Sequence, residues 1–211
     1  MLNDNNIPSE RHFQAYLEFA SLGLRAQAKT AVKALIRSLP SQNEKETWVL
    51  KHFDELRALV RVRGRIQHDI YLQIVFPAIR ASFEKGDPEA MFMLAITWEN
   101  VAETPDAKDI ATALGPIELL KRASACEPEN KLFKQTLLEE LVSSFEYIDH
   151  EWPAGLLLDH SNLQGELLEL KNELKLARNL DHEKRYTKRL NEFSSNVDAY
   201  WERINSKETG H

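Results

Sequence analysis

A chain of 211 residues with 43% hydrophobic content and a formal net charge of −6 is long enough for one large domain or two small ones in contact. Seven glycines and eight prolines are too few for the turns of an all-β fold, and a single cysteine, Cys126, excludes an internal disulfide. The polar first residues do not resemble a signal peptide and no apolar run approaches the ~20 residues that cross a bilayer, so the sequence predicts a cytoplasmic protein without a membrane partner.

The first forty residues predict a pair of helices. Ser9 opens a helix that Gly23 ends, and its apolar residues recur at the spacing of one helical face: Phe13, Tyr16, Leu17 and Ala20. A second helix over 24–39 stops at Pro40.

Capping signals predict the helices that follow. Residues 41–44, Ser-Gln-Asn-Glu, have the form of a capping box and start a helix that runs through Val60. Gly64 separates or bends this helix from one that covers Ile66 to Val75. Pro77 then kinks or restarts the chain, since its ring removes a helical N–H.

Gly86-Asp87-Pro88 marks a clear boundary, with Gly as a stop, Asp as an N-cap and Pro at the first helical position. A helix is predicted over 88–102, and the polar stretch 103–108 is predicted to be a loop. Residues 110–126 are helical with an interruption at Gly115-Pro116.

Glu127-Pro128-Glu129 opens the next predicted helix, which runs through Phe145, and residues 149–160 are the least regular part of the chain. Residues 161–164 form another capping box. Apolar residues then recur at spacings of three and four on both sides of a polar turn at 179–182, which predicts an antiparallel helical hairpin.

These elements predict an all-α protein of stacked antiparallel helix pairs, either α-solenoid-like or an irregular bundle, that ends in a C-terminal helical hairpin. The expected division is 1–160, with an acidic second half, and 161–211, with the hairpin packed on the first part as one domain.

Two segments, 34–40 and 119–128, resemble the end of the second helix of a tetratricopeptide-type repeat. Ala28 and Pro40 fall where that repeat has small and proline residues, whereas Tyr16 stands where it has glycine. The similarity covers about a third of the chain. It implies a right-handed stack of helix pairs that holds partner proteins or peptides.

Clusters that suggest chemistry have simpler explanations. Adjacent residues in a helix point about 100° apart, so Asp149-His150-Glu151 and Asp181-His182-Glu183 cannot chelate one ion from a helix, and Asp181 is better explained as an N-cap. Cys126 has no neighbouring cation and is expected to be a buried or half-buried apolar residue. The sequence therefore predicts no catalytic, cofactor or metal site and no enzyme.

Two further patterns, a His-Asp pair and a set of regularly spaced arginines, leave alternative functions open. His68-Asp69 is similar to the pair used by all-helical metal-dependent phosphohydrolases, with His52 as the nearest upstream histidine. Arg57, Arg61 and Arg65 are spaced by four, which predicts one basic helical face that is solvated, meets the acidic middle of the chain, or meets RNA. The overall acidity disfavours nucleic acid.

The charge is distributed unevenly along the chain. Residues 87–174 carry six Lys and Arg against 18 Asp and Glu, and no basic residue lies between Lys134 and Lys171. Such a field attracts a basic partner, and nearby aromatic side chains can anchor it. The predicted partner-binding residues come from this segment: Glu139, Glu140, Glu146, Tyr147, Asp149, Glu151, Trp152 and Asp159.

The resulting hypothesis is a non-enzymatic protein-binding helical domain. Its most concrete form is an inhibitor that neutralises a basic effector such as a nuclease toxin, as immunity proteins do. A repeat-type adaptor or chaperone that holds a peptide in a groove is one alternative, and a metal-dependent phosphohydrolase is another. An acidic surface that serves solubility alone is a further interpretation. The sequence does not give the partner's identity or the oligomeric state.

Overall fold

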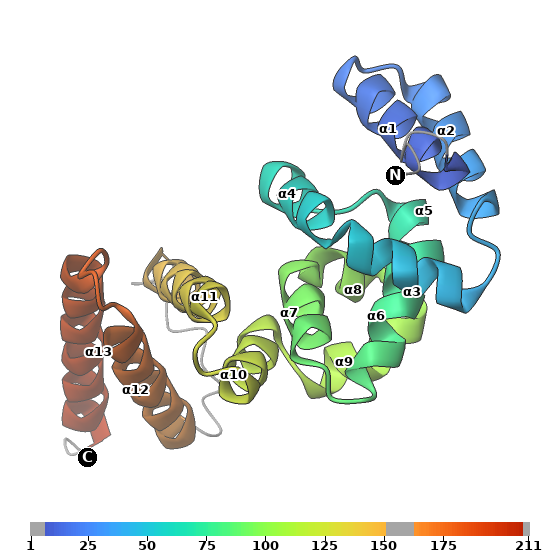
Figure 1. The fold of residues 1–211 in the computed structure, drawn as a ribbon. Helices are drawn as coiled ribbons and strands as arrows, with labels where there is room; N and C mark the ends of the chain where they lie inside the picture. Colours follow the sequence, from blue (N-terminus) through green and yellow to red (C-terminus); the bar gives the residue numbers. More distant parts are fainter. Residues whose placement is uncertain (1–6, 151–162, 209–211) are drawn as a thin grey trace. The chain divides into compact units, whose positions relative to one another are not determined.

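The computed structural model describes residues 7–150 and 163–208, and helices make up most of both ranges (Figure 1). No strand occurs within these ranges, so the predicted all-α class is confirmed. None of the helices in the described ranges is both long enough and apolar enough to cross a membrane.

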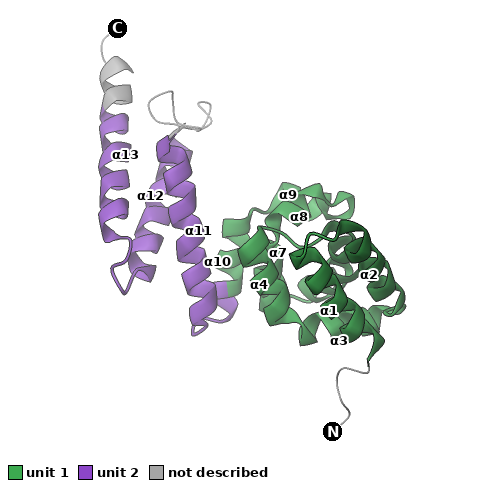
Figure 2. Ribbon diagram, turned by 90° about the horizontal axis from the view of Figure 1, so that it is seen from above, with its two compact units in different colours: residues 1–123 green, residues 124–211 purple. Residues whose placement is uncertain are grey.

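The chain divides into two compact units, residues 1–123 and 124–211, which Figure 2 distinguishes by colour. The boundary lies within helix α10 (Pro116–Cys126), whereas the sequence suggested a division after residue 160. The two divisions differ because α11 (Lys131–His150), which precedes residue 160, packs against the C-terminal hairpin.

The first pair of helices forms as predicted. Helices α1 (Pro8–Ser21) and α2 (Arg25–Arg37) lie against each other (Figure 1). Gly23, with φ of +72°, makes the turn between them in the left-handed region that favours glycine. Residues on the facing sides are buried: Phe13, Tyr16, Ala31, Val32 and Leu35.

The single helix predicted from the capping box is two helices, α3 (Gln42–Lys51) and α4 (Phe53–Arg63). The capping box itself is confirmed, since the Ser41 N–H donates to the Glu44 carboxylate at 2.8 Å. The break falls at His52, whose backbone leaves the helical region with φ of −102° and ψ of 18°.

His52 is buried and connects this break to α1. Its Nε2 lies 2.9 Å from the Glu10 carboxylate. The centroid of its ring lies 4.7 Å from the Trp48 ring centroid and 5.1 Å from the Phe13 ring centroid. Lys51 adds an ion pair to Glu10 at 3.1 Å. Glu10 therefore joins α1 to the end of α3.

After Gly64, which ends α4 with φ of +75°, the chain forms α5 (His68–Ile70), a π-helical turn (Tyr71–Val75) and α6 (Phe76–Phe83). Pro77 is the second residue of α6, which follows the π turn without a loop between them. The Phe76 N–H donates to the Tyr71 carbonyl five residues back, so the wider π turn lies directly before the proline and its missing N–H.

The helix predicted over 88–102 is also two helices, α7 (Pro88–Ile96) and α8 (Trp98–Glu103). They separate at Thr97, whose fully buried hydroxyl donates to the Met93 carbonyl at 2.6 Å and lies 3.2 Å from the Tyr71 hydroxyl. A polar side chain that bonds back to its own helix favours such a bend.

The predicted loop at 103–108 is partly helical, with a 3₁₀ turn (Pro105–Ala107) followed by α9 (Lys108–Ala113). Arg80 of α6 holds this segment, because its guanidinium bonds to the Asp106 carbonyl and to the Asp109 carboxylate. The predicted interruption at Gly115-Pro116 is confirmed, and α10 begins at the proline.

Asn100 of α8 fixes the loop between α4 and α5. Its side-chain oxygen accepts the Ile66 N–H at 2.9 Å, and its side-chain NH₂ donates to the Ile66 carbonyl at 2.9 Å. Both residues are 1% exposed. One amide side chain therefore satisfies both backbone groups of a residue that enters the core outside a helix.

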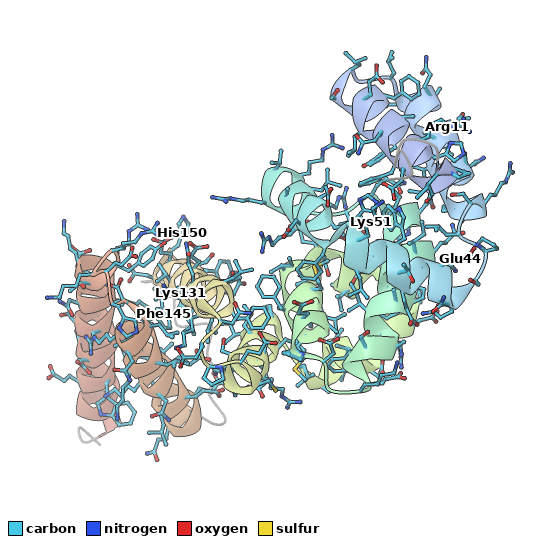
Figure 3. All side chains as sticks on the ribbon, viewed as in Figure 1. Arg11, Glu44, Lys51, Lys131, Phe145 and His150 are labelled. Carbon is cyan, nitrogen blue, oxygen red and sulfur yellow. The ribbon has the colours of Figure 1, made fainter. Side chains whose placement is uncertain are left out.

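The second unit contains α11 (Lys131–His150), α12 (Leu163–Leu180) and α13 (Thr187–Glu208). The Asn130 side chain caps α11 by accepting the Leu132 and Phe133 N–H groups, so α11 begins two residues after the predicted Glu-Pro-Glu start. Lys131 and His150, labelled in Figure 3, are the first and last residues of α11.

The predicted C-terminal hairpin is confirmed, and α11 packs against both of its helices. Phe145 of α11, labelled in Figure 3, stacks on Phe193 of α13, and their ring centroids are 4.8 Å apart. The hairpin's predicted seam is buried at Leu167, Leu170, Leu174, Ala177, Leu190, Phe193 and Val197. Buried Asp181 binds the turn by accepting the Arg185 and Tyr186 N–H groups at 2.8 and 3.0 Å.

Replacing Asn100 with Ala should destabilise the first unit by about 2–4 kcal/mol, because the Ile66 N–H and C=O would stay buried without partners. Urea unfolding of the full chain measures this free energy. Asn43→Ala, at an exposed position in α3 of the same unit, should change it by less than about 0.5 kcal/mol. Equal effects of the two substitutions would contradict the structural role given to Asn100.

The Glu10 contact predicts a dependence of stability on pH. Burial alone raises the pKa of Glu10, but hydrogen bonds and charge from His52 and Lys51 outweigh it and lower the pKa below 4.5. A carboxylate with a lowered folded pKa stabilises the protein above its unfolded pKa, and this contribution is lost as the pH falls through the folded value.

Glu10→Gln should therefore be less stable than the unmodified chain at pH 6, and the difference should shrink as the pH falls from about 4.5 towards 3. Thermal unfolding followed by circular dichroism across this range measures it. Glu18→Gln, on the same helix at a position for which no ion pair is found within the described residues, is the control. A difference that is constant with pH would show that the Glu10 charge does not contribute.

Candidate functional site

The structure places five of the eight predicted partner-binding residues on α11: Glu139, Glu140, Glu146, Tyr147 and Asp149. The other three, Glu151, Trp152 and Asp159, lie outside the described residues. The acidic surface can therefore be assessed on α11.

The five residues do not share one face of α11. At 100° per residue, Glu139 and Glu146 lie about 20° apart around the helix, and so do Glu140 and Tyr147. The two pairs are about 100° from each other, and Asp149 is turned about 180° from Glu140. Spacing in the sequence had placed them in one acidic segment, whereas the helix distributes them around its circumference.

Glu146 and Asp149 contact α13. The Arg189 guanidinium bonds to the Glu146 carboxylate, and the Asn196 side-chain NH₂ donates to Asp149 at 2.7 Å. These contacts join α11 to the hairpin. Part of the negative charge counted from the sequence is therefore paired within the unit itself.

The same two carboxylates line a cavity of about 240 Å³ between α11 and α13. The stacked rings of Phe145 and Phe193 also line it, and Arg189 and Glu192 are at its polar side. Its charged residues are three carboxylates, Glu146, Asp149 and Glu192, against one guanidinium, so Arg189 offsets only part of the negative charge of the cavity.

The other three predicted residues on α11 differ in how much of their surface is exposed to solvent. Glu139 is exposed and accepts a hydrogen bond from Gln135 at 3.0 Å, and Tyr147 has 62% of its surface exposed. Glu140 is half-buried, and this burial raises the pKa of its carboxyl group. Glu139 and Tyr147 are thus a predicted charge and a predicted aromatic anchor that are exposed and that, within the described residues, form no hydrogen bond or ion pair with another helix.

The histidine and cysteine patterns occupy separate places. Buried His52 bonds to Glu10, whereas exposed His68 lines a cavity with Arg63 and Asn100. Within residues 7–150 and 163–208, no group of three or more His, Cys, Asp or Glu side chains is arranged to hold a metal ion. The expectation of a buried or half-buried Cys126 was wrong: it is exposed, because it is the last residue of α10.

The predicted basic face of Arg57, Arg61 and Arg65 does not form. Helix α4 ends at Arg63, and the left-handed turn at Gly64 takes Arg65 off the helix. Arg57 pairs with Asp54 at 3.1 Å, and Arg65 pairs with Glu103 of α8 at 3.3 Å.

The sequence did not reveal a second site in the first unit. A cavity of about 620 Å³ is lined by Tyr16, Arg63, Arg65, Ile66, Gln67, His68, Asn100 and Glu103. The one local signal for it is Gly64, which ends α4 directly after Arg63. Its walls come from four helices, and nothing in the order of the residues indicates that they meet.

Comparison with protein-family models, with curated proteins and with solved structures gives no significant match to this chain. The similarity to tetratricopeptide-type repeats remains a prediction. The fold and the surface chemistry of the described residues are therefore the basis for any proposal on function.

The α11 contacts predict unequal structural roles for its carboxylates. Asp149→Ala should lower the stability of the second unit by about 1–2 kcal/mol, because it removes a hydrogen bond to a charged acceptor that joins two helices. Glu139→Ala should lower it by less than about 0.5 kcal/mol, since its one contact is with Gln135 on the same helix.

Chemical unfolding of the full chain, followed by the near-ultraviolet signal of its aromatic residues, measures both variants. Asn196→Ala should match Asp149→Ala, and the double variant should add little to either one. Additive losses would show that the Asp149–Asn196 contact does not stabilise the unit.

Proposed function

We propose that this chain is a non-enzymatic helical protein that binds a basic partner protein through the exposed side of α11. Its most concrete role is that of an inhibitor that neutralises a basic effector such as a nuclease, as immunity proteins do. The observation that carries the proposal is the exposure of Tyr147. This side chain is 62% exposed, and the charged residues nearest to it along α11 are Asp and Glu, without a Lys or Arg among them.

An exposed tyrosine of this kind suits an interface. It can bury a large apolar ring in a partner's pocket while its hydroxyl group keeps a hydrogen bond, and tyrosine is enriched among the residues that dominate binding energy. Glu140 lies close to Tyr147 around the helix, two turns before it, and Glu139 is on the adjoining exposed side. An anchor beside two carboxylates favours a partner with basic residues around an apolar pocket.

The charge of this surface is smaller than the sequence suggested. Arg189 neutralises part of the charge of Glu146, and Asp149 faces α13. No basic residue occurs in the sequence between Lys134 and Lys171, however, so Glu139 and Glu140 have no basic neighbour on α11 after Lys134. Such a field accelerates association with a cationic protein and weakens with salt.

The adaptor alternative requires a groove that accommodates a peptide. Unit 1 has an apolar cavity between α3, α4, α6 and α7, lined in part by Val49, Leu50, Phe53, Ile79 and Met93. Its volume is about 70 Å³, which holds a side chain and not an extended peptide. This apolar cavity therefore does not support a peptide-holding groove.

The test is affinity capture from the source cells with the full chain as bait, followed by quantitative mass spectrometry. Three baits are compared: the unmodified chain, Glu139→Lys with Tyr147→Ala, and the control Glu169→Lys, an exposed position on α12. The first and third baits should retain the same strongly basic protein, and the double variant should lose it.

The captured protein is then purified, and its association rate with each bait is measured by stopped flow at low and high salt. The double variant Glu139→Lys with Tyr147→Ala should associate about tenfold more slowly than the unmodified chain at low salt, and the difference should shrink at high salt. Retention of one partner by all three baits, with equal association rates, would refute a role for α11.

A further inference from the structure

We propose that the 620 Å³ cavity in the first unit binds a small phosphate monoester, a site separate from the protein-binding surface proposed on α11. The walls of this cavity come from α1, α4, the α4–α5 loop, α5 and α8, all within residues 1–123. Its volume lies in the range of about 300–1,000 Å³ that is typical of small-molecule sites.

Hydrogen-bond donors that have no anionic partner line this cavity. Arg63 contacts the Tyr16 hydroxyl at 3.4 Å, and no carboxylate within the described residues forms an ion pair with it. No hydrogen bond or ion pair is found for the His68 ring within the same residues. A neutral imidazole donates one N–H and a charged one donates two, so His68 can donate at any pH.

The carboxylate that lines the cavity is already paired. Glu103 binds Arg65 at 3.3 Å, so these two lining charges offset each other. Glu99 lies beside Gly64 but is not among the lining residues. The remaining lining charge is the guanidinium of Arg63, with the Tyr16 hydroxyl and the His68 ring as additional donors.

The loop that positions these donors is fixed before any ligand binds. Asn100 holds both backbone groups of Ile66, and the Gln67 side chain accepts the Ile70 N–H at 2.9 Å. Gly64 makes the left-handed turn between Arg63 and Arg65. Binding therefore requires little ordering of the backbone, which favours affinity.

The arrangement favours a phosphate group over a carboxylate. A carboxylate has two oxygens, which one guanidinium satisfies, whereas a phosphate monoester has three terminal oxygens that accept from Arg63, Tyr16 and His68 together. The Tyr16 ring and buried Ile66 provide apolar surface for the organic part of the ester. An aryl phosphate is therefore a suitable probe.

The experiment is isothermal titration of the full chain with phenyl phosphate at constant ionic strength. The same titration is repeated for Arg63→Gln, for Tyr16→Phe and for the control Arg61→Gln, which removes an exposed charge two residues away that does not line the cavity. Circular dichroism verifies that each variant is folded.

Phenyl phosphate should bind with a dissociation constant of about 1 mM or tighter. Arg63→Gln should weaken binding roughly tenfold or more, and Tyr16→Phe should weaken it severalfold, because each removes a donor to a charged group. Arg61→Gln should stay within about twofold of the unmodified chain. Benzoate should bind at least severalfold more weakly than phenyl phosphate.

Three results would overturn the proposal: no saturable binding up to about 10 mM, equal losses in Arg61→Gln and Arg63→Gln, or benzoate binding as tightly as phenyl phosphate. Inorganic phosphate distinguishes the source of the affinity. Weaker binding of inorganic phosphate than of phenyl phosphate supports a monoester site, and equal binding contradicts the role given to the apolar wall.

Discussion

The contact between Asn100 and Ile66 is the constraint on which the first unit depends. The chain enters the core between α4 and α5 outside a helix, where an unpaired N–H or C=O is costly. The oxygen and the NH₂ of the Asn100 side chain satisfy both of these groups, so the loop can be both buried and rigid. Arg63, Arg65 and His68 flank that loop, and their positions around the cavity follow from it.

Buried polar side chains also explain why two predicted helices are broken. Apolar spacing continues through His52 and Thr97, so local sequence predicts uninterrupted helices there. Each side chain instead has a partner from a distant part of the chain, Glu10 for His52 and Tyr71 for Thr97. Those pairings are tertiary, and local propensity and spacing carry no signal for them.

Features set by local backbone chemistry could be predicted from the sequence. The Ser41–Glu44 capping box, the stop at Gly64, the interruption at Gly115-Pro116 and the C-terminal hairpin all form where expected. The candidate site could be predicted only in part. Counting charge identified an acidic segment, but the contacts of Glu146 with Arg189 and of Asp149 with Asn196 join residues more than 40 positions apart.

That pairing changes what the acidic segment can do. Carboxylates that join α11 to α13 lose part of their field to a neighbouring cation or amide, and removing them for a binding test would also disturb the fold. Among the described residues, no hydrogen bond or ion pair joins Glu139 or Tyr147 to α13, so their substitution tests binding with less structural effect. The cationic cavity belongs to the other unit. The protein-binding surface and the phosphate monoester site that we propose therefore lie in separate units, so a variant that abolishes binding at one should leave the other intact.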